Sequence, residues 1–420
     1  MNIKLIDSDN FKKQINIIPL IIIGSGISGL TIASKMKDKE FLILEARDRI
    51  GGRVFTNESN MDIGAAWLHG SDSNPLNEYL NFDNLLPISN SNPWMHSENT
   101  NIKYMNNKYN ITEEKRQRLA SKWNKLASEI GNKNNQTIIK SFEEIKNNNI
   151  NGDKYNGDDD KYNGDDDKYN GDDDKYNGDD DEYNDIFSFL YMTEVWSGGS
   201  IKNISASFLN AKNNPNTLFG DYAGSHYLFK NGAHSLIDGI IKSANNNIYD
   251  KIKYNQIVTK VIYNNDYVEL HTCDNQIYYC KQLCITIPPG PLKNIQFYPP
   301  LDNKRLESLS RIKLGSYKKV QLEFIEDQIF WHNNNNYPMF LTYNSKMNGK
   351  EYYLSDNKNN ELFPYILWNN YKYSKNKPIL EAIFPADIGW KLAGMSDEII
   401  VDMVTSHLSN YYPNMPQPIA

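Results

Sequence analysis

The chain has 420 residues, of which 39% are hydrophobic, and its formal net charge at pH 7 is −7. This length predicts a large buried core and two or three domains. One acidic segment, residues 151–185, holds 15 acidic residues and 4 lysines, so the remaining 385 residues carry a net charge of +4. The acidity therefore belongs to one segment and gives no indication of a cationic substrate.

The three cysteines, Cys273, Cys280 and Cys284, form no CxxC pair and lie in strand-like sequence. They predict buried thiols in a reducing compartment, so we expect an intracellular protein, cytoplasmic or nuclear. The apolar stretch of residues 15–23 is too short to span a bilayer. We therefore expect no signal peptide, no transmembrane segment and no membrane partner.

A short apolar run is interrupted by Gly24, Gly26 and Gly29 and continues into an amphipathic run, a pattern that predicts a strand, a turn and a helix. Gly24 permits the tight turn, Gly26 leaves room for a pyrophosphate, and Gly29 lets the helix pack on the strand. A second apolar strand, residues 41–44, ends in Glu45, whose carboxylate is placed to accept both hydroxyls of an adenosine ribose. The glycine pattern alone also occurs in turns that bind no nucleotide. The strand, helix, second strand and terminal acid together predict a dinucleotide site.

The sequence continues as ARDRIGGR (residues 46–53) and MDIGAAWLHG (residues 61–70). With Glu45, these segments resemble the flavin-dependent amine oxidase family, whose members carry EARxRxGGR and a following GAxWxHG-like turn against the flavin. The resemblance implies FAD as the bound cofactor, and the physical reading agrees with it, because paired glycines let backbone approach phosphate and an arginine can neutralise it. Isolated arginines would otherwise indicate surface salt bridges. The resemblance implies FAD contacts from these residues: Arg47, Gly52, Arg53, Gly64, Ala65, Ala66 and Trp67.

The fold implied by the resemblance is α/β: a doubly wound FAD-binding domain of the Rossmann-like, glutathione-reductase type, with an α+β substrate domain, both discontinuous in sequence. The FAD-binding segments are expected at residues 1–80 and 217–293. The substrate-domain segments are expected at residues 81–150 and 185–216, which are helical, and at residues 294–420.

The acidic insert, residues 151–184, repeats DKYNGDD with a period of seven. Each repeat has a single Tyr and no apolar seam, so a coiled coil is excluded and a disordered loop is expected. A calcium loop also fails, because Gly164 at the sixth position would put Lys161 third and Asn170 twelfth.

Periodicity predicts further elements along the chain. Helices are expected at residues 112–130, 138–146, 185–196, 205–209 and 396–412, a strand, glycine turn and helix at 224–238, and strands at 252–254, 258–262, 267–272, 276–280 and 282–287. By resemblance, the backbone of Val258 would contact the adenine, and Thr286 and Pro288 would lie near the cofactor. The chain departs from the family pattern in having Pro289 and Pro291 in this turn.

Two residues are implied at the reacting centre. Lys319 falls where the family places a lysine that holds a water against flavin N5, although a lone strand lysine is usually a solvated surface group. His69 falls where polyamine oxidases carry a histidine that touches the bound amine, although a lone histidine is often structural. Related proteins continue past this chain's last residues with a GxxxFAGE-like strand and a closing helix. We therefore expect the third FAD-binding segment to be absent and FAD to be held weakly.

The chemistry implied is oxidation of an amine carbon–nitrogen bond: hydride passes to flavin N5, the imine hydrolyses to an aldehyde, and oxygen returns the flavin to its oxidised state as hydrogen peroxide forms. No metal is required. The WLHG turn, residues 67–70, favours a polyamine substrate. The expected partners are a small-molecule amine and oxygen, with no direct nucleic-acid binding.

Two alternatives to a polyamine oxidase stay open. A lysine-specific histone demethylase would add a helical docking module and a helical tower, and the sequence predicts neither. An inactive scaffold would keep the amine oxidase shell without FAD. A nicotinamide dehydrogenase is disfavoured, because the GGR and GAAWLHG segments have no role in one.

Overall fold

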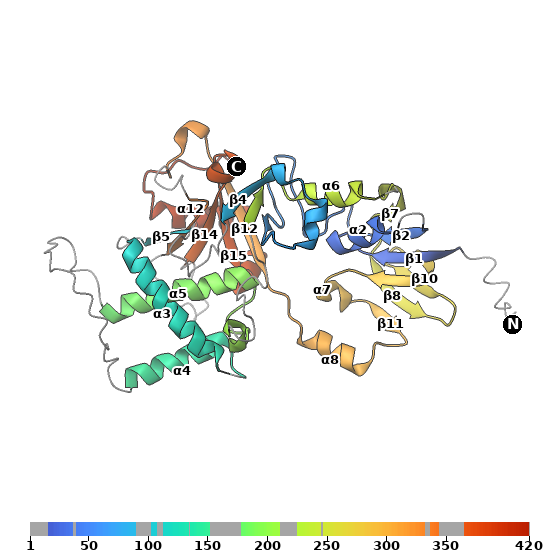
Figure 1. Ribbon diagram of the computed structural model, residues 1–420, viewed down its shortest axis with the longest axis horizontal. Coiled ribbons are helices and arrows are strands. Elements are labelled where there is room, and N and C mark those ends of the chain that lie inside the picture. Colours follow the sequence, from blue (N-terminus) through green and yellow to red (C-terminus); the bar gives the residue numbers. More distant parts are fainter. Residues whose placement is uncertain are drawn as a thin grey trace, which may run out of the picture. The chain divides into compact units, whose positions relative to one another are not determined.

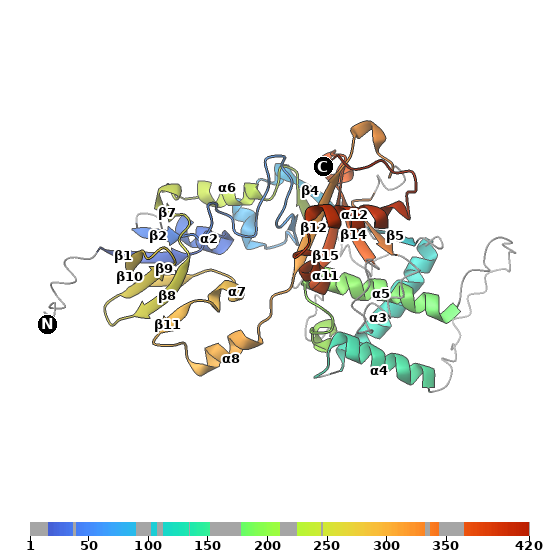
Figure 2. The same ribbon diagram turned by 180° about the vertical axis from the view of Figure 1, so that it is seen from behind.

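The computed structural model describes residues 16–36, 39–89, 102–106, 112–133, 135–151, 178–210, 225–244, 247–331, 337–343 and 365–419. The chain divides into two compact units (Figures 1 and 2). The first comprises Met1–Leu68, Ser73–Leu86 and Tyr227–Leu314, and the second comprises His69–Asp72, Pro87–His226 and Gly315–Ala420. Both units are therefore discontinuous in sequence.

A seven-stranded mixed sheet forms the centre of the first unit, in the order β11-β8-β9-β10-β1-β2-β7. Strand β1 pairs in parallel with β10 and β2, whereas β8, β9 and β10 pair antiparallel. The strands are β1 Ile17–Ile23, β2 Phe41–Leu44, β7 Ile252–Lys253, β8 Val258–Tyr263, β9 Val268–Thr272, β10 Ile277–Ile285 and β11 Gln296–Tyr298. The predicted α/β class is confirmed. The doubly wound arrangement stays a prediction.

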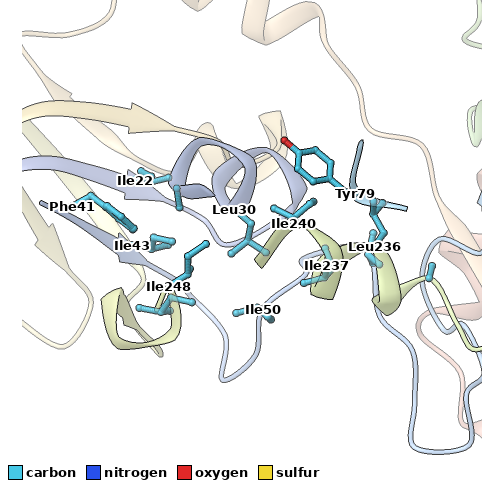
Figure 3. Packing of buried hydrophobic residues seen from close by; sticks show 14 of the residues in the cluster. Ile22, Leu30, Phe41, Ile43, Ile50, Tyr79, Leu236, Ile237, Ile240 and Ile248 are labelled. Atoms are coloured by element: carbon cyan, nitrogen blue, oxygen red, sulfur yellow. The ribbon is translucent and has the colours of Figure 1, made fainter. Parts of the chain in front are cut away.

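Strand β1 is apolar at successive positions because both of its faces are covered, as in a central parallel strand. Ile22 packs in the same cluster as Leu30 of α2 (Ile27–Ser34) and Ile237 of α6 (His234–Lys242), shown in Figure 3. Ile21 points to the opposite face and packs with Leu270 of β9. Burying each such side chain contributes about 1.5 to 3 kcal/mol, so the hydrophobic cores on both faces hold β1 in place.

A five-stranded sheet, in the order β12-β15-β14-β13-β5, forms the centre of the second unit. All its pairs are antiparallel except β13 with β5. The strands are β5 Ile102–Asn106, β12 Tyr317–Glu323, β13 Met339–Tyr343, β14 Tyr365–Asn370 and β15 Ile379–Pro385. On one face, Leu322, Trp368 and Ala382 share a core with helices α11 (Ala386–Leu392) and α12 (Asp397–Ser409). On the other face, helix α5 (Gly178–Ser197) contacts β15.

The remaining elements are short or helical. A three-stranded sheet has the order β3-β6-β4, with β3 Trp67–Leu68, β6 His226–Phe229 and β4 Leu85–Ser89. The other helices are α3 Glu113–Gly131, α4 Ile138–Asn151, α7 Pro289–Leu292, α8 Asn303–Arg311 and α10 Tyr371–Lys375. The 3-10 turns are η1 Pro75–Tyr79, η2 Phe82–Asn84, η4 Ala206–Leu209, η5 Tyr249–Lys251 and η6 Glu326–Gln328. Within the described residues, no helix combines the length and the apolar character needed to cross a bilayer.

Three sequence-based boundaries need correction. Helix α5 begins at Gly178, inside the expected insert, where the acids that follow favour a helix N-terminus. The rest of the insert, residues 152–177, lies outside the described residues. The strands expected at 276–280 and 282–287 form the single strand β10. Strand β11 pairs with β8 in the first unit, although the substrate segment was expected to begin at residue 294.

Candidate functional site

The site residues predicted from the sequence divide between the two units. The residues expected to hold the cofactor, from Gly24 to Pro288, lie in the first unit. The two residues expected at the reacting centre, Lys319 and His69, lie in the second. Each group makes its own local contacts.

Three glycines shape the turn between β1 and α2. Gly24 has a φ of +98°, in the left-handed region that favours glycine. A Cβ on Gly29 would lie 2.0 Å from the Gly24 carbonyl oxygen, so a side chain there would push α2 off the turn. A Cβ on Gly26 would meet no described atom within 4 Å. Open space therefore borders the backbone at the N-terminus of α2, where free N–H groups favour an anion.

The GGR segment reaches the same turn. The N–H of Gly51 donates to the Ser25 carbonyl at 2.9 Å, and Gly51 forms an isolated parallel bridge with Gly26. Gly52 has a φ of +60°, and a Cβ there would lie 3.3 Å from the Cα of Gly26. The structure thus brings Gly26 and Gly52 together, and the open space lies beside Gly26.

Glu45 follows β2 and is 6% exposed. Its Oε2 accepts from the N–H and the hydroxyl of Ser25 at 2.7 and 2.6 Å, and its Oε1 accepts from the N–H of Arg47 at 3.0 Å. A carboxylate accepts about four hydrogen bonds, so accepting both ribose hydroxyls would require one of these three bonds to be released. Sequence analysis missed Ser25. Its position between two glycines of the motif was the available signal.

Thr286 joins the end of β10 to the glycine turn. Its hydroxyl donates to the carbonyls of Ile23 and Gly24 at 2.8 and 3.1 Å, so it lies against the turn, and its contact with the cofactor stays a prediction. Pro288 occupies the N-cap position of α7 and makes no side-chain capping bond. The side chain of Val258 is buried in the core of the first unit. A contact of its backbone with an adenine stays a prediction.

Two arginines hold the GG turn. The guanidinium groups of Arg47 and Arg49 each donate through Nη1 to the Gly52 carbonyl, at 3.2 and 3.0 Å. Arg49 also lies 4.2 Å from the centroid of the Phe55 ring. The side chain of Arg53 is exposed. Sequence analysis missed Arg49, although it lies in the same arginine-rich run, and this residue supports the turn from the protein side.

The GAAW turn packs on the backbone of the GGR segment. A Cβ on Gly64 would lie 2.1 Å from the carbonyl oxygen of Arg53, and the N–H of Ala65 donates to that oxygen at 3.0 Å. Ala65 is exposed, Ala66 is buried, and Trp67 is half-buried at the start of β3. These contacts fix the turn in place. A contact between its residues and a flavin stays a prediction.

These residues fit the phosphates and one ribose of a dinucleotide such as FAD. The open space at Gly26 lies where free N–H groups of α2 would meet a pyrophosphate. The buried carboxylate of Glu45 provides an acceptor for a ribose hydroxyl, and the exposed Arg53 provides positive charge.

His69 lies against a second histidine. The Nδ1 atoms of His69 and His226 are 3.3 Å apart, and Trp196 makes an edge contact with His69 at a centroid distance of 6.4 Å. Burial, and then the neighbouring His226, lower the pKa of His69 to about 4. His69 is therefore neutral at pH 7. Sequence analysis missed His226 and Trp196, because no local pattern links residues so distant in the chain.

Lys319 lies in β12 with 13% of its side chain exposed, and its Nζ is 3.4 Å from Oε1 of Glu381 in β15. Gln321 and Asn369 donate to the same carboxylate, each at 2.7 Å. Lys319 is therefore part of a buried polar cluster and is not a solvated surface lysine. Sequence analysis missed Glu381. The signal was a single acid within the apolar run of residues 379–385.

Comparisons with known proteins identify the family. A family model described as "Flavin containing amine oxidoreductase" matches residues 27–420. The chain is 26% identical to "Probable polyamine oxidase 4" of Arabidopsis thaliana, over 98% of this chain and 75% of that protein. It is 25% identical to "Polyamine oxidase 4" of Oryza sativa subsp. japonica, over 95% of this chain and 74% of that protein. It is 24% identical to "Lysine-specific histone demethylase 2" of Homo sapiens, over 73% of this chain and 34% of that protein.

Proposed function

Because the chain belongs to the flavin-containing amine oxidoreductase family, we propose that it uses FAD to oxidise a polyamine at a carbon next to nitrogen. The observation that carries this proposal is the convergence of the glycine turn, the GGR segment and Thr286 on one open backbone surface. When bound, FAD supplies the acceptor for the hydride and passes the electrons on to oxygen, which gives hydrogen peroxide.

The first unit holds the cofactor through its backbone and one acid. The free N–H groups of α2 beside Gly26 hold the pyrophosphate, and Glu45 accepts a ribose hydroxyl. Ser25 keeps the Glu45 carboxylate in place through two hydrogen bonds. Arg49 keeps the Gly52 carbonyl in position, so the backbone is preorganised before the cofactor arrives.

The second unit acts on the amine. An amine gives up hydride from the neighbouring carbon when its nitrogen keeps a free lone pair, so the reacting nitrogen must be neutral. The neutral pair of His69 and His226 provides hydrogen-bonding nitrogens and adds no charge that would repel the remaining ammonium groups of a polyamine. Lys319 holds a water for the reaction at the flavin. These roles support a polyamine as substrate, and two of the similar proteins are named as polyamine oxidases.

The proposal is tested with the purified chain. We expect the visible absorption spectrum of bound FAD, loss of that absorption on anaerobic addition of spermine, and hydrogen peroxide when air is admitted. A methylated lysine peptide is the matched alternative substrate. Turnover of the peptide but not of spermine would replace the polyamine with the demethylase alternative, and recovery of NAD, or failure of the chain to bind added FAD, would refute the flavin site.

Lys319→Met tests the lysine. We expect one flavin half-reaction to slow by about 10²-fold or more, with FAD still bound. The change removes the counter-charge of the buried Glu381 and costs about 3 to 5 kcal/mol of stability, so rates are compared only for flavin-loaded protein. Lys318→Met is the control, because Lys318 is the adjacent residue, its side chain is 35% exposed and its Nζ lies 3.9 Å from Asp397. Unchanged rates in both half-reactions of Lys319→Met would return Lys319 to a structural role.

A further inference from the structure

A fully buried carboxylate lies inside an apolar strand of the second unit. Glu381 has 0% exposure and its neighbours along β15 are also buried. Burying a charge is costly unless it is paired and hydrogen-bonded. Here both conditions are met, because Gln321 and Asn369 donate to its two oxygens and Lys319 provides the opposite charge.

The strand register explains how these side chains meet. Glu381 is directly opposite Gln321 on β12 and directly opposite Asn369 on β14. Lys319 lies two residues before Gln321, so it shares that face of the sheet. Leu322 and Ala382 occupy the alternate positions and face the core shared with α11 and α12. The polar cluster is therefore confined to the opposite face.

Asn369 leaves one buried acceptor in this cluster without a partner. Its Nδ2 faces Oε1 of Glu381, and this orientation is required because a carboxylate only accepts hydrogen bonds. Its Oδ1 is buried and has no hydrogen-bond partner among the described residues. Buried acceptors are normally satisfied, so this oxygen calls for a donor such as a water. The cluster thus has an acceptor available for a donor beside Glu381.

The ion pair is not explained by stability alone. Well-packed apolar residues of similar volume serve a buried sheet as well as an ion pair does, or better. A lysine side chain has four rotatable bonds, and a fixed carboxylate restricts where its ammonium lies. The pair therefore points to a need for an ammonium at a defined position on this face of the sheet.

We propose that Glu381 is a positioning residue that acts through Lys319, holding its ammonium in the place that the flavin half-reactions require. This rests on the proposed role of Lys319 at the flavin. Gln321 and Asn369 hold the carboxylate in turn, from the strands on either side of β15.

A double-mutant cycle on the full chain tests the proposal, with Glu381→Gln, Lys319→Met and the combination. The first readout is the rate at which bound, photoreduced flavin is reoxidised by air, together with its rate of reduction by spermine. We expect Glu381→Gln to slow the half-reaction controlled by Lys319 about tenfold or more, and to have less than about a twofold effect when Lys319 is already Met. Equal slowing in both backgrounds would overturn the proposal.

A second readout needs no flavin and no amine. We expect the urea midpoints of the flavin-free variants to be non-additive, because the two buried charged groups contact each other and each single change alters the surroundings of the other. Additive midpoints would show that the pair does not form. Unaltered reoxidation and reduction rates in Glu381→Gln, with a shifted midpoint, would make Glu381 merely structural.

Two further variants separate positioning from loss of fold. Glu381→Asp keeps the charge, so we expect it to recover part of the rate lost in Glu381→Gln even if Lys319→Met fails to fold. Thr342→Val is the matched control, because Thr342 bonds His407 and Trp368 on the opposite face of the same sheet, at 2.8 and 2.9 Å. It should lower the urea midpoint and leave both flavin rates unchanged. If Lys319→Met has no effect on either rate while the midpoints are coupled, the role of Lys319 fails and the ion pair is structural.

Discussion

Gly26→Ala and Gly29→Ala change the same turn by one methyl group and should have opposite consequences. A Cβ on Gly26 meets open space, and the backbone there, with φ −75° and ψ −178°, suits alanine. Loss of chain entropy in the unfolded state favours alanine by about 0.4 to 1 kcal/mol, and its weaker helix capping offsets a similar amount. We therefore expect the stability of flavin-free Gly26→Ala to lie within about 1 kcal/mol of the parent.

The same methyl group fills the space proposed for the pyrophosphate. Loss of hydrogen bonds to a charged group costs about 1.5 to 3 kcal/mol each, which lowers FAD affinity by about 10- to 150-fold. In Gly29→Ala the Cβ would lie 2.0 Å from the Gly24 carbonyl, so the turn itself must shift, at a cost near the upper end of about 1 to 3 kcal/mol.

Two measurements separate these effects: urea unfolding of the flavin-free chain and FAD binding followed by flavin fluorescence. Gly26→Ala should lose affinity and keep its midpoint, whereas Gly29→Ala should lose both. Parental FAD affinity in Gly26→Ala would show that the pyrophosphate does not lie at this turn and would refute the proposed pyrophosphate site beside Gly26. A lowered midpoint in Gly26→Ala would show that its open space is filled in the folded chain.

Two further predictions concern pH and the acidic repeat. The pKa of His69 is lowered to about 4, so its contribution to stability is fully present above pH 6.5 and is lost as pH falls towards 4, by up to about 3 kcal/mol. Urea unfolding from pH 7 to 4 should show this slope, and His69→Gln should flatten it; identical profiles would contradict the assignment. Deleting residues 158–171, which are two of the seven-residue repeats, should change the free energy of unfolding by less than about 1 kcal/mol, because the repeat has no apolar seam and closure entropy varies slowly with loop length. Loss of soluble protein on deletion would show that the repeat has a structural role.

Much of the first unit could be predicted from sequence because its signals are local. Residues 20–23 are apolar at every position since the strand is covered on both faces, and the glycines that follow are needed within one turn. Thr112 and Ser396 each cap a helix, as their positions predict. The start of α5 at Gly178 was missed because the acidic repeat has no hydrophobic periodicity to mark where a helix begins.

The sequence by itself determined the family, and it predicted a nucleotide turn and site roles for Lys319 and His69, because each is carried by a contiguous motif with a fixed spacing. Only the tertiary structure decided what surrounds those two side chains. Glu381 reaches Lys319 through cross-strand register, and His226 reaches His69 across 157 residues. Strand register and chain reversal bring such residues together, and neither leaves a local pattern in the sequence. The conformational freedom of both side chains depends on those partners, which is why their surroundings could not be read from the motifs alone.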